Sequence, residues 1–104
     1  MRYANPTRGL SRPAFAFRRD HLPKPAEYYS EQGLKLIGRG EWRSALCPFH
    51  KDTTPSLRVH LESGAWRCMA CDAHGGDVLS FHMQRHELRF IEAAKVLGAW
   101  EESR

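Results

Sequence analysis

No run of apolar residues in this 104-residue sequence approaches the roughly 20 that a helix needs to span a bilayer, which excludes a transmembrane role. Only three cysteines are present, and an odd number argues against a framework of disulfides. Residues 1–6 have no apolar core of the kind that a secretion signal requires. We therefore expect a cytoplasmic protein with reduced thiols and no membrane partner.

The sequence contains no set of catalytic side chains at a spacing typical of an active site. The sequence shows no pair of carboxylates, no nucleophile beside a base and no phosphate-cradling glycine loop in a pattern typical of an enzyme. We therefore predict that this chain is not an enzyme by itself, and we assign no catalytic residue.

Positive charge is concentrated at the start of the sequence. The formal net charge is +4, but residues 1–24 carry six basic side chains against Asp20 alone, so the remaining residues sum to −1. Four of the six prolines lie in residues 1–25, and this density interrupts any helical or strand period. We predict a flexible basic arm over residues 1–25, a domain over residues 26–100 and a tail over residues 101–104.

Within the predicted arm, residues 14–19 combine two phenylalanines with two arginines that follow them. Aromatic rings can stack on bases while arginines neutralise phosphates, so Arg18 and Arg19 are candidate nucleic-acid-binding residues. The alternative is a solvated tail whose phenylalanines pack onto the domain. The sequence does not decide between the two.

The sequence does contain a set of metal ligands. Cys47 and His50 are separated by two residues, and so are Cys68 and Cys71. Each pair is typical of a tight knuckle, and two knuckles supply the four corners of a tetrahedron. Three thiolates and one imidazole form a soft, closed set that suits a single structural Zn²⁺ and leaves no position for a catalytic water. A redox dithiol is the alternative for the second pair, but the βαβ pattern that usually surrounds one is absent.

A further histidine leaves the fourth ligand open by spacing alone. His74 follows Cys71 closely and could replace His50. We favour His50 because it shares a knuckle with Cys47, whereas ligands at positions 68, 71 and 74 would crowd one turn.

The pattern around the ligands predicts an α+β fold, a zinc ribbon. A small antiparallel sheet with a Cys₃His zinc site is preceded by a short helix and followed by two short packed helices. Asp77 is expected to cap the first of those two helices. The predicted strands are residues 34–40, 42–46, 56–61 and 65–68, and the predicted helices are residues 26–32, the segment after Asp77 and about 88–97.

The strand at residues 56–61 alternates strictly, so we expect it to bury one face and expose the other. Basic side chains on the exposed face could follow a phosphate backbone, although arginine stems can also simply shield apolar surface. Both Trp42 and Trp66 are expected in the core, because a small domain needs its large apolar areas inside. The candidate nucleic-acid-binding residues of this face are Arg43, Arg58, His60 and Arg67.

The succession Cys47-Pro48-Phe49-His50, Thr54-Pro55-Ser56, Cys68-Met69-Ala70-Cys71 and Gly75-Gly76-Asp77 resembles the CHC2 zinc-binding domain of bacterial DnaG-type DNA primases. The resemblance covers about residues 26–100. It implies that both knuckles hold the zinc and that the ribbon engages single-stranded template where an RNA primer begins. The family usually has glycine after the last cysteine, at a backbone position that favours positive φ, where this chain has Asp72.

The primase catalytic domain of that family has no counterpart in this sequence. The resemblance therefore predicts a zinc-binding, DNA-binding module of primase type that serves replication without synthesising the primer itself. Its expected partners are single-stranded DNA and a separate primase, helicase or other replication protein. Because residues 25–104 are nearly neutral, an alternative is a protein–protein adaptor in a mobile-element replication or transfer complex.

Overall fold

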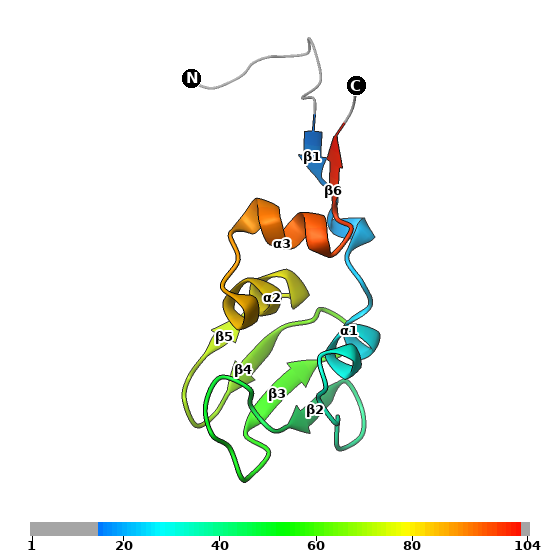
Figure 1. Ribbon diagram of the computed structural model, residues 1–104. Helices are drawn as coiled ribbons and strands as arrows, with labels where there is room; N and C mark the ends of the chain where they lie inside the picture. The colour runs from blue at the N-terminus through cyan, green and yellow to red at the C-terminus, as the bar shows by residue number, and fades with distance from the viewer. Residues whose placement is uncertain (1–14, 103–104) are drawn as a thin grey trace, which may run out of the picture.

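The structure, a computed structural model, describes residues 15–102 and shows two small sheets and three α-helices (Figure 1). Strands β2 to β5 form one antiparallel sheet in sequence order, and β1 pairs separately with β6. This confirms the α+β class, with one α-helix before the four-stranded sheet and two after it. None of the helices in residues 15–102 is long and apolar enough to cross a membrane. The elements are β1 (Phe15–Phe17), the 3₁₀ helix η2 (Arg19–His21), α1 (Pro25–Glu31), β2 (Trp42–Ala45), β3 (Leu57–His60), β4 (Trp66–Cys68), β5 (His74–Gly75), α2 (Val78–His86), α3 (Phe90–Val96) and β6 (Trp100–Glu102).

The segment before α1 is folded against the C-terminal part of the chain. Strand β1 pairs antiparallel with β6, and the Arg18 N–H donates to the Ala99 carbonyl at 2.7 Å. The Phe17 ring packs edge-on against Phe90, with centroids 5.1 Å apart. The expected lack of regular structure is therefore wrong for residues 15–25, because local sequence gave no sign of this long-range pairing. Residues 1–14 and 103–104 lie outside the described residues, so the division into arm, domain and tail stays a prediction.

Helix α1 confirms the predicted first helix, but the predicted strand at residues 34–40 is wrong. Only an isolated bridge forms there, in which Ile37 and Ser44 exchange N–H···O bonds of 2.7 and 2.9 Å. Gly33, Gly38 and Gly40 have φ of 86°, 112° and 80°. Left-handed glycines this closely spaced keep turning the chain, so it cannot extend as a regular strand.

The main core lies between the inner face of the four-stranded sheet and helices α1 and α2. The Phe81 ring meets Tyr29 and Trp66 edge-on, with centroids 5.0 and 5.1 Å apart. The Tyr29 hydroxyl donates to the Gly64 carbonyl at 2.6 Å, which ties α1 to the turn between β3 and β4. The buried residues of this cluster are Tyr28, Tyr29, Cys47, Leu57, Val59, Trp66, Cys68, Val78 and Phe81. Two of the predicted metal ligands are thus part of the core.

Helix α2 begins where the sequence predicted, at the Asp77 cap. The Asp77 carboxylate accepts from the Ser80 N–H at 2.8 Å, and the Ser80 hydroxyl accepts from the Trp66 indole N–H at 3.1 Å. A Cβ at Gly75 would collide with the Ser80 hydroxyl and the Trp66 indole nitrogen. Glycine at position 75 therefore allows β5 to approach α2 closely.

A second, smaller core joins α2, α3 and the β1–β6 pair. Leu79, Ala93 and Ala94 are buried there. Glu87, with φ of 55°, ends α2 in the left-handed conformation and redirects the chain into α3. The predicted second C-terminal helix is confirmed, and it forms a layer between α2 and the β1–β6 pair (Figure 1).

Candidate metal centre

The two knuckles meet at one end of the four-stranded sheet. The possible ligand atoms of Cys47, His50, Cys68 and Cys71 all lie within 4.8 Å of one another. The two Sγ atoms of Cys47 and Cys71 are 3.9 Å apart, and His50 Nε2 lies 3.3 Å from Cys68 Sγ. Tetrahedral zinc, with bonds near 2.3 Å to sulfur and 2.0–2.1 Å to nitrogen, places its ligand atoms about 3.6–3.8 Å apart. The donor set and its spacing therefore fit one structural zinc ion.

Backbone N–H groups surround the cysteine sulfurs. The N–H groups of Ala70 and Cys71 donate to Cys68 Sγ at 3.4 and 3.3 Å, and that of Phe49 donates to Cys47 Sγ at 3.4 Å. Burial raises the pKa of Cys68, but the N–H donors of Cys71 and Ala70 outweigh it and lower the pKa to about 6. Burial raises the pKa of Cys47 to about 12. Cys47 therefore needs the charge of the zinc ion in order to bind as a thiolate.

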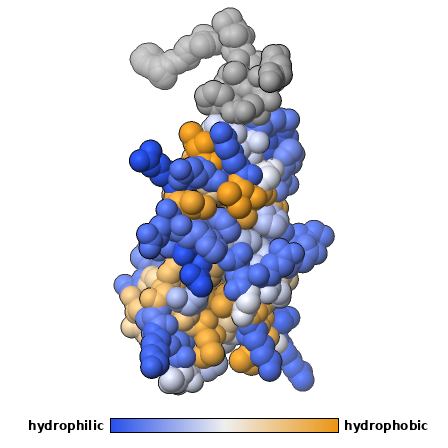
Figure 2. All heavy atoms as spheres, viewed as in Figure 1, coloured by the Kyte–Doolittle hydropathy of each residue, from blue (hydrophilic) through white to orange (hydrophobic). Residues whose placement is uncertain are grey.

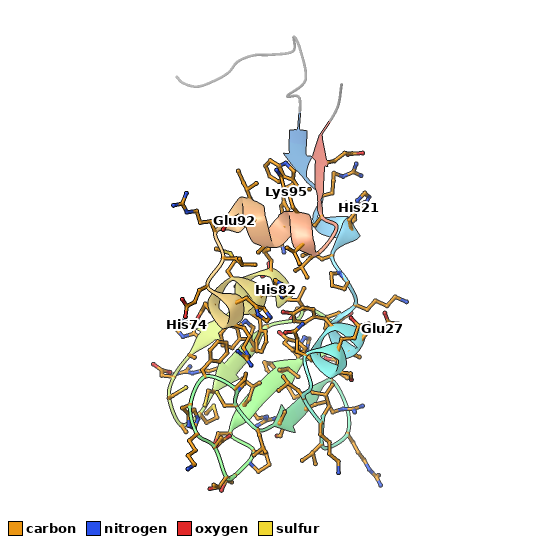
Figure 3. The ribbon with its side chains drawn as sticks, viewed as in Figure 1. His21, Glu27, His74, His82, Glu92 and Lys95 are labelled. Carbon is orange, nitrogen blue, oxygen red and sulfur yellow. The ribbon has the colours of Figure 1, made fainter. Side chains whose placement is uncertain are left out.

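His50, rather than His74, completes the ligand set. His50 Nδ1 donates to the Lys51 carbonyl at 3.1 Å, which leaves Nε2 unprotonated and directed at Cys68. His74 lies on the edge strand β5 (Figure 3), and its Nδ1 donates to the Asp72 carbonyl at 2.9 Å. The choice of His50 from shared-knuckle spacing agrees with this arrangement.

Asp52 supports the first knuckle, a role that the sequence interpretation missed. Its carboxylate accepts from the N–H groups of Cys47 and Ser56 at 2.9 and 3.1 Å and from the Ser56 hydroxyl at 3.2 Å. The Cys47 N–H is the main reason that the pKa of Asp52 is lowered, followed by the bonds from Ser56. An Asp four residues before a Ser in a turn-rich segment was the available signal, because such side chains often cap their own loop.

Comparison with known proteins identifies this zinc ribbon. Residues 29–102 match the family described as the CHC2 zinc finger, the zinc ribbon of DnaG. The chain belongs to the CHC2 zinc finger family. The DNA primase of Borreliella burgdorferi is 39% identical to this CHC2 domain over 67 residues, which cover 64% of this chain and 13% of that primase. The Gene 58 protein of Mycobacterium phage D29 is 41% identical over 56 residues, or 54% of this chain and 43% of that protein.

A solved structure supports the same assignment. The crystal structure of the Aquifex aeolicus primase, with its zinc-binding and RNA polymerase domains, is similar to this chain with a TM-score of 0.64 and 30% identity. The similarity covers 73% of this chain and 18% of that one. The chain is thus a DnaG-type CHC2 domain with one structural zinc, and it spans a small part of the primases it matches.

The outer face of the four-stranded sheet carries three of the four basic residues predicted to share it. In the register, Arg58 lies opposite Arg67, and His60 lies opposite Trp42. Residues directly opposite each other point to the same face. Arg43 is the exception, because it pairs with the buried Val59 and therefore belongs to the inner face. The prediction that Arg43 joins the other three is wrong, because the alternation of β2 runs one residue out of the expected phase.

The same register separates the two tryptophans that we expected in the core. Trp66 is buried, as predicted. Trp42 is 46% exposed on the outer face, so its predicted burial is wrong. The Arg58 guanidinium lies 5.9 Å from the Trp42 ring centroid, and the His60 ring lies 4.8 Å away on a neighbouring strand. The polar residue Ser44, two residues after Trp42, was the sequence signal for this phase.

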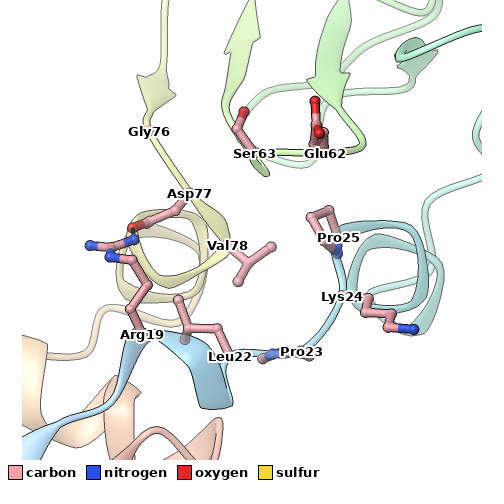
Figure 4. A pocket seen from close by; sticks show the side chains of 10 residues that line it. All are labelled: Arg19, Leu22, Pro23, Lys24, Pro25, Glu62, Ser63, Gly76, Asp77 and Val78. Atoms are coloured by element: carbon pink, nitrogen blue, oxygen red, sulfur yellow. Dashed lines mark hydrogen bonds and ion pairs between the residues drawn. The ribbon is translucent and has the colours of Figure 1, made fainter.

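Most of the candidate cations already contact carboxylates. Arg18 pairs with Glu101 at 2.7 Å, and Arg19 pairs with Asp77 at 2.7 Å. The Arg19 pair borders a hollow of about 520 Å³ between the segment before α1 and the start of α2 (Figure 4). These two arginines therefore fasten the N-terminal segment to the domain.

On the outer face of the four-stranded sheet, two of the three basic side chains have a carboxylate partner and one does not. Arg67 donates to Asp72 Oδ1 at 2.8 Å, and Asp72 has the positive φ, 66°, expected at this position. His60 Nε2 donates to Glu41 at 3.1 Å, since its Nδ1 accepts from the Ser63 N–H. Arg58 pairs with no carboxylate among residues 15–102, so among the three basic residues of this face it is the one most available to an anionic ligand.

Proposed function

We propose that this CHC2 domain binds single-stranded DNA template through the outer face of its four-stranded sheet during RNA primer synthesis. The observation that carries the proposal is an exposed aromatic ring, Trp42, beside the unpaired cation Arg58 on an open sheet. Proteins that bind single strands combine such rings, which stack on bases, with cations that track phosphates. The DNA primases among its relatives support a role in replication.

Of the six candidate nucleic-acid-binding residues, the contacts favour Arg58. Arg67 and His60 lie on the same face, but both are paired with carboxylates. Arg43 faces inward, where its Nε donates to the Gly40 carbonyl at 2.9 Å. Arg18 and Arg19 would have to give up ion pairs to reach a phosphate. We propose that primer synthesis itself belongs to a polymerase domain or to a separate replication protein, in the cytoplasm.

Fluorescence anisotropy with a labelled single-stranded oligonucleotide and the zinc-loaded chain tests the proposal. Binding should weaken steeply with salt, because each neutralised phosphate contributes about −0.7 to the slope of log affinity against log salt. Arg58→Gln should lower both the affinity and the magnitude of that slope. The matched control is Arg85→Gln on the exposed side of α2, which should change neither. Absence of binding at low salt with zinc bound would refute the proposal.

A protein–protein adaptor is the second candidate function. Three apolar side chains of α3 are exposed, namely Phe90, Ile91 and Val96. In Figure 2 apolar atoms are visible at the level of α3, and a further group lies lower, at the level of the four-stranded sheet. Such a patch suits a separate primase, helicase or other replication protein. Deletion of residues 1–14 discriminates the two functions: if all DNA affinity is lost with that segment, the folded domain serves protein contacts instead.

A further inference from the structure

A shallow hollow on the outer face of the sheet has the character of a binding site for one flat, apolar group. It measures about 240 Å³ and is lined by Trp42, Arg58, Arg67 and Met69. Its walls are thus an indole, a thioether and the stems of two arginines. The volume lies below the roughly 300–1,000 Å³ of sites for drug-sized ligands, so it suits a smaller group.

The apolar side chains that line this hollow are largely exposed and are not packed into the core. Trp42 is 46% exposed and Met69 is 68% exposed, whereas Trp66 in the same sheet is buried in the core. Two large apolar side chains that adjoin on an open face leave area that a ligand can remove from water.

The indole is held in place before any ligand arrives. The His60 ring lies against Trp42 with centroids 4.8 Å apart. His60 is itself fixed from two sides, by the Ser63 N–H at 3.1 Å and by Glu41 at 3.1 Å. A ring that is already oriented loses less conformational entropy on binding, which favours its use as a stacking surface.

Charge around the hollow selects an anionic strand. The Arg58 guanidinium lies 5.9 Å from the Trp42 ring centroid and pairs with no carboxylate in the described part of the chain. Arg67, on the other side, is held by Asp72 at 2.8 Å. One cation without a carboxylate partner therefore lies beside an apolar stacking surface, which is the combination that binds a nucleotide.

We propose that this hollow is a pocket for one unpaired nucleobase, which stacks on Trp42 while Arg58 contacts the adjacent phosphate. This inference rests on the proposed function and adds the residue that receives the base. The four lining side chains offer no amide or carboxylate to read a base edge, and Arg67 is already engaged. Stacking on an indole is tolerant of sequence because every base has a π-face, so we expect little discrimination among oligo-dT, oligo-dC and oligo-dA.

A double-mutant cycle between protein and DNA tests the pocket. Zinc-loaded wild-type chain and Trp42→Ala are titrated with oligo-dT and with an abasic oligonucleotide of the same length. Trp42→Ala should weaken oligo-dT binding roughly 5- to 150-fold, the range for loss of one stacked base. Its effect on the abasic strand should be absent, and its salt slope should equal that of the wild type. Trp42→Phe should retain most of the affinity.

Two controls separate the possible failures. Ile91→Ala, an exposed apolar residue of α3, should leave every affinity unchanged. If the wild-type chain does not bind single-stranded DNA at all, the proposed function fails together with the pocket. If the wild type binds but Trp42→Ala binds oligo-dT equally well, or weakens both strands alike, only the base pocket is overturned. The base pocket would also be overturned if Trp42→Ala lost binding to a protein partner while its DNA affinity stayed unchanged, because the hollow would then receive a protein side chain.

Discussion

At residue 72 an acidic side chain pairs with a basic one on the exposed surface. Asp72 takes a left-handed backbone conformation, with φ of 66°, and its Oδ1 accepts from Arg67 Nε and Nη2 at 3.1 and 2.8 Å. The carboxylate weighs against a strong DNA contact at Arg67, because it lowers the local positive potential. The left-handed backbone is a separate cost to folding, on the order of 1 kcal/mol for a residue other than glycine.

Replacing Asp72 should therefore strengthen DNA binding. Asp72→Asn keeps a side chain that tolerates the left-handed region but removes the charge, so we expect higher affinity for single-stranded DNA. The salt slope should become steeper by about 0.7, as Arg67 gains a phosphate. Anisotropy titrations at several salt concentrations measure both quantities. Asp72→Gly should give the same slope, and unchanged slopes in both variants would show that Arg67 does not contact the strand.

A buried histidine makes the stability of the domain depend on pH. The Tyr28 hydroxyl donates to His82 Nδ1 at 2.7 Å, because burial raises the pKa of Tyr28 and keeps it protonated. Burial lowers the pKa of His82, and the nearby charge of His86 lowers it further. In the unfolded chain His82 therefore binds a proton near pH 6.5, whereas in the folded chain it stays neutral to lower pH. Stability from neutral His82 is fully present above about pH 6.5 and is lost as the pH falls towards the lower folded-state pKa.

His82→Gln tests that linkage. The variant should be less stable than the wild type at pH 7.5, because the bond from Tyr28 is weakened. The difference in free energy of unfolding should shrink as the pH falls to 5.5, since only the wild type loses the His82 contribution. Urea unfolding of both proteins at each pH, in excess zinc, measures the difference. A gap that stays constant over this range would contradict the assignment of a neutral, buried His82.

At the scale of elements, the loop between β2 and β3 prepares the first zinc knuckle. Asp52 binds the backbone of Cys47 and Ser56 and so fixes the loop that carries His50. Removing a group that orients metal ligands typically lowers metal affinity 10- to 100-fold. We expect Asp52→Ala to lower zinc affinity at least tenfold in competition with a chromogenic chelator, although all four ligands remain.

The two histidines near the knuckles provide the comparison for that experiment. His50→Ala should lose stoichiometric zinc, whereas His74→Ala should keep the affinity of the wild type. Asp52→Asn, which retains a hydrogen-bond acceptor, should fall between Asp52→Ala and the wild type. Wild-type affinity in Asp52→Ala would mean that the knuckle is fixed by other contacts.

How far the sequence predicted these elements depended on the range of the interactions involved. The zinc ligands and the Asp77 cap were predicted because their signals are spacings of two or three residues. The phase of β2 was missed because Trp42 in the core was favoured by size, while the actual register exposes it. The β1–β6 pair was missed because its strands are separated by almost the whole domain and each is only three residues long.

At the scale of the whole molecule, the zinc site links the sheet to its core. Cys47 and Cys68 are members of the main core cluster, and Phe49, within the first knuckle, stacks on Trp66 with centroids 5.1 Å apart. Structural zinc can contribute on the order of 10 kcal/mol to folding, which is comparable to the net stability of a small domain. Removal of the metal should therefore dismantle the sheet.

Complete removal of zinc with a strong chelator should shift the emission of Trp66 to the red and abolish the near-ultraviolet circular dichroism. A Trp42→Phe background reduces the contribution of exposed indole to this signal. Readdition of zinc should restore the native spectra. Spectra that persist after the metal has left would show that the ribbon folds without it.

The molecule presents different surfaces at its two ends: the open sheet beside the zinc site, and the apolar side chains of α3 towards the β1–β6 pair. This separation would allow the domain to hold a template strand while a replication protein is bound elsewhere. Nuclear magnetic resonance of the ¹⁵N-labelled, zinc-loaded chain, titrated with a short oligo-dT, tests the central claim most directly. The account predicts that the largest shifts occur in β2, β3, β4 and the Trp42 indole N–H. Shifts concentrated in α3 and the β1–β6 pair, with Trp42 and Arg58 unchanged, would contradict it.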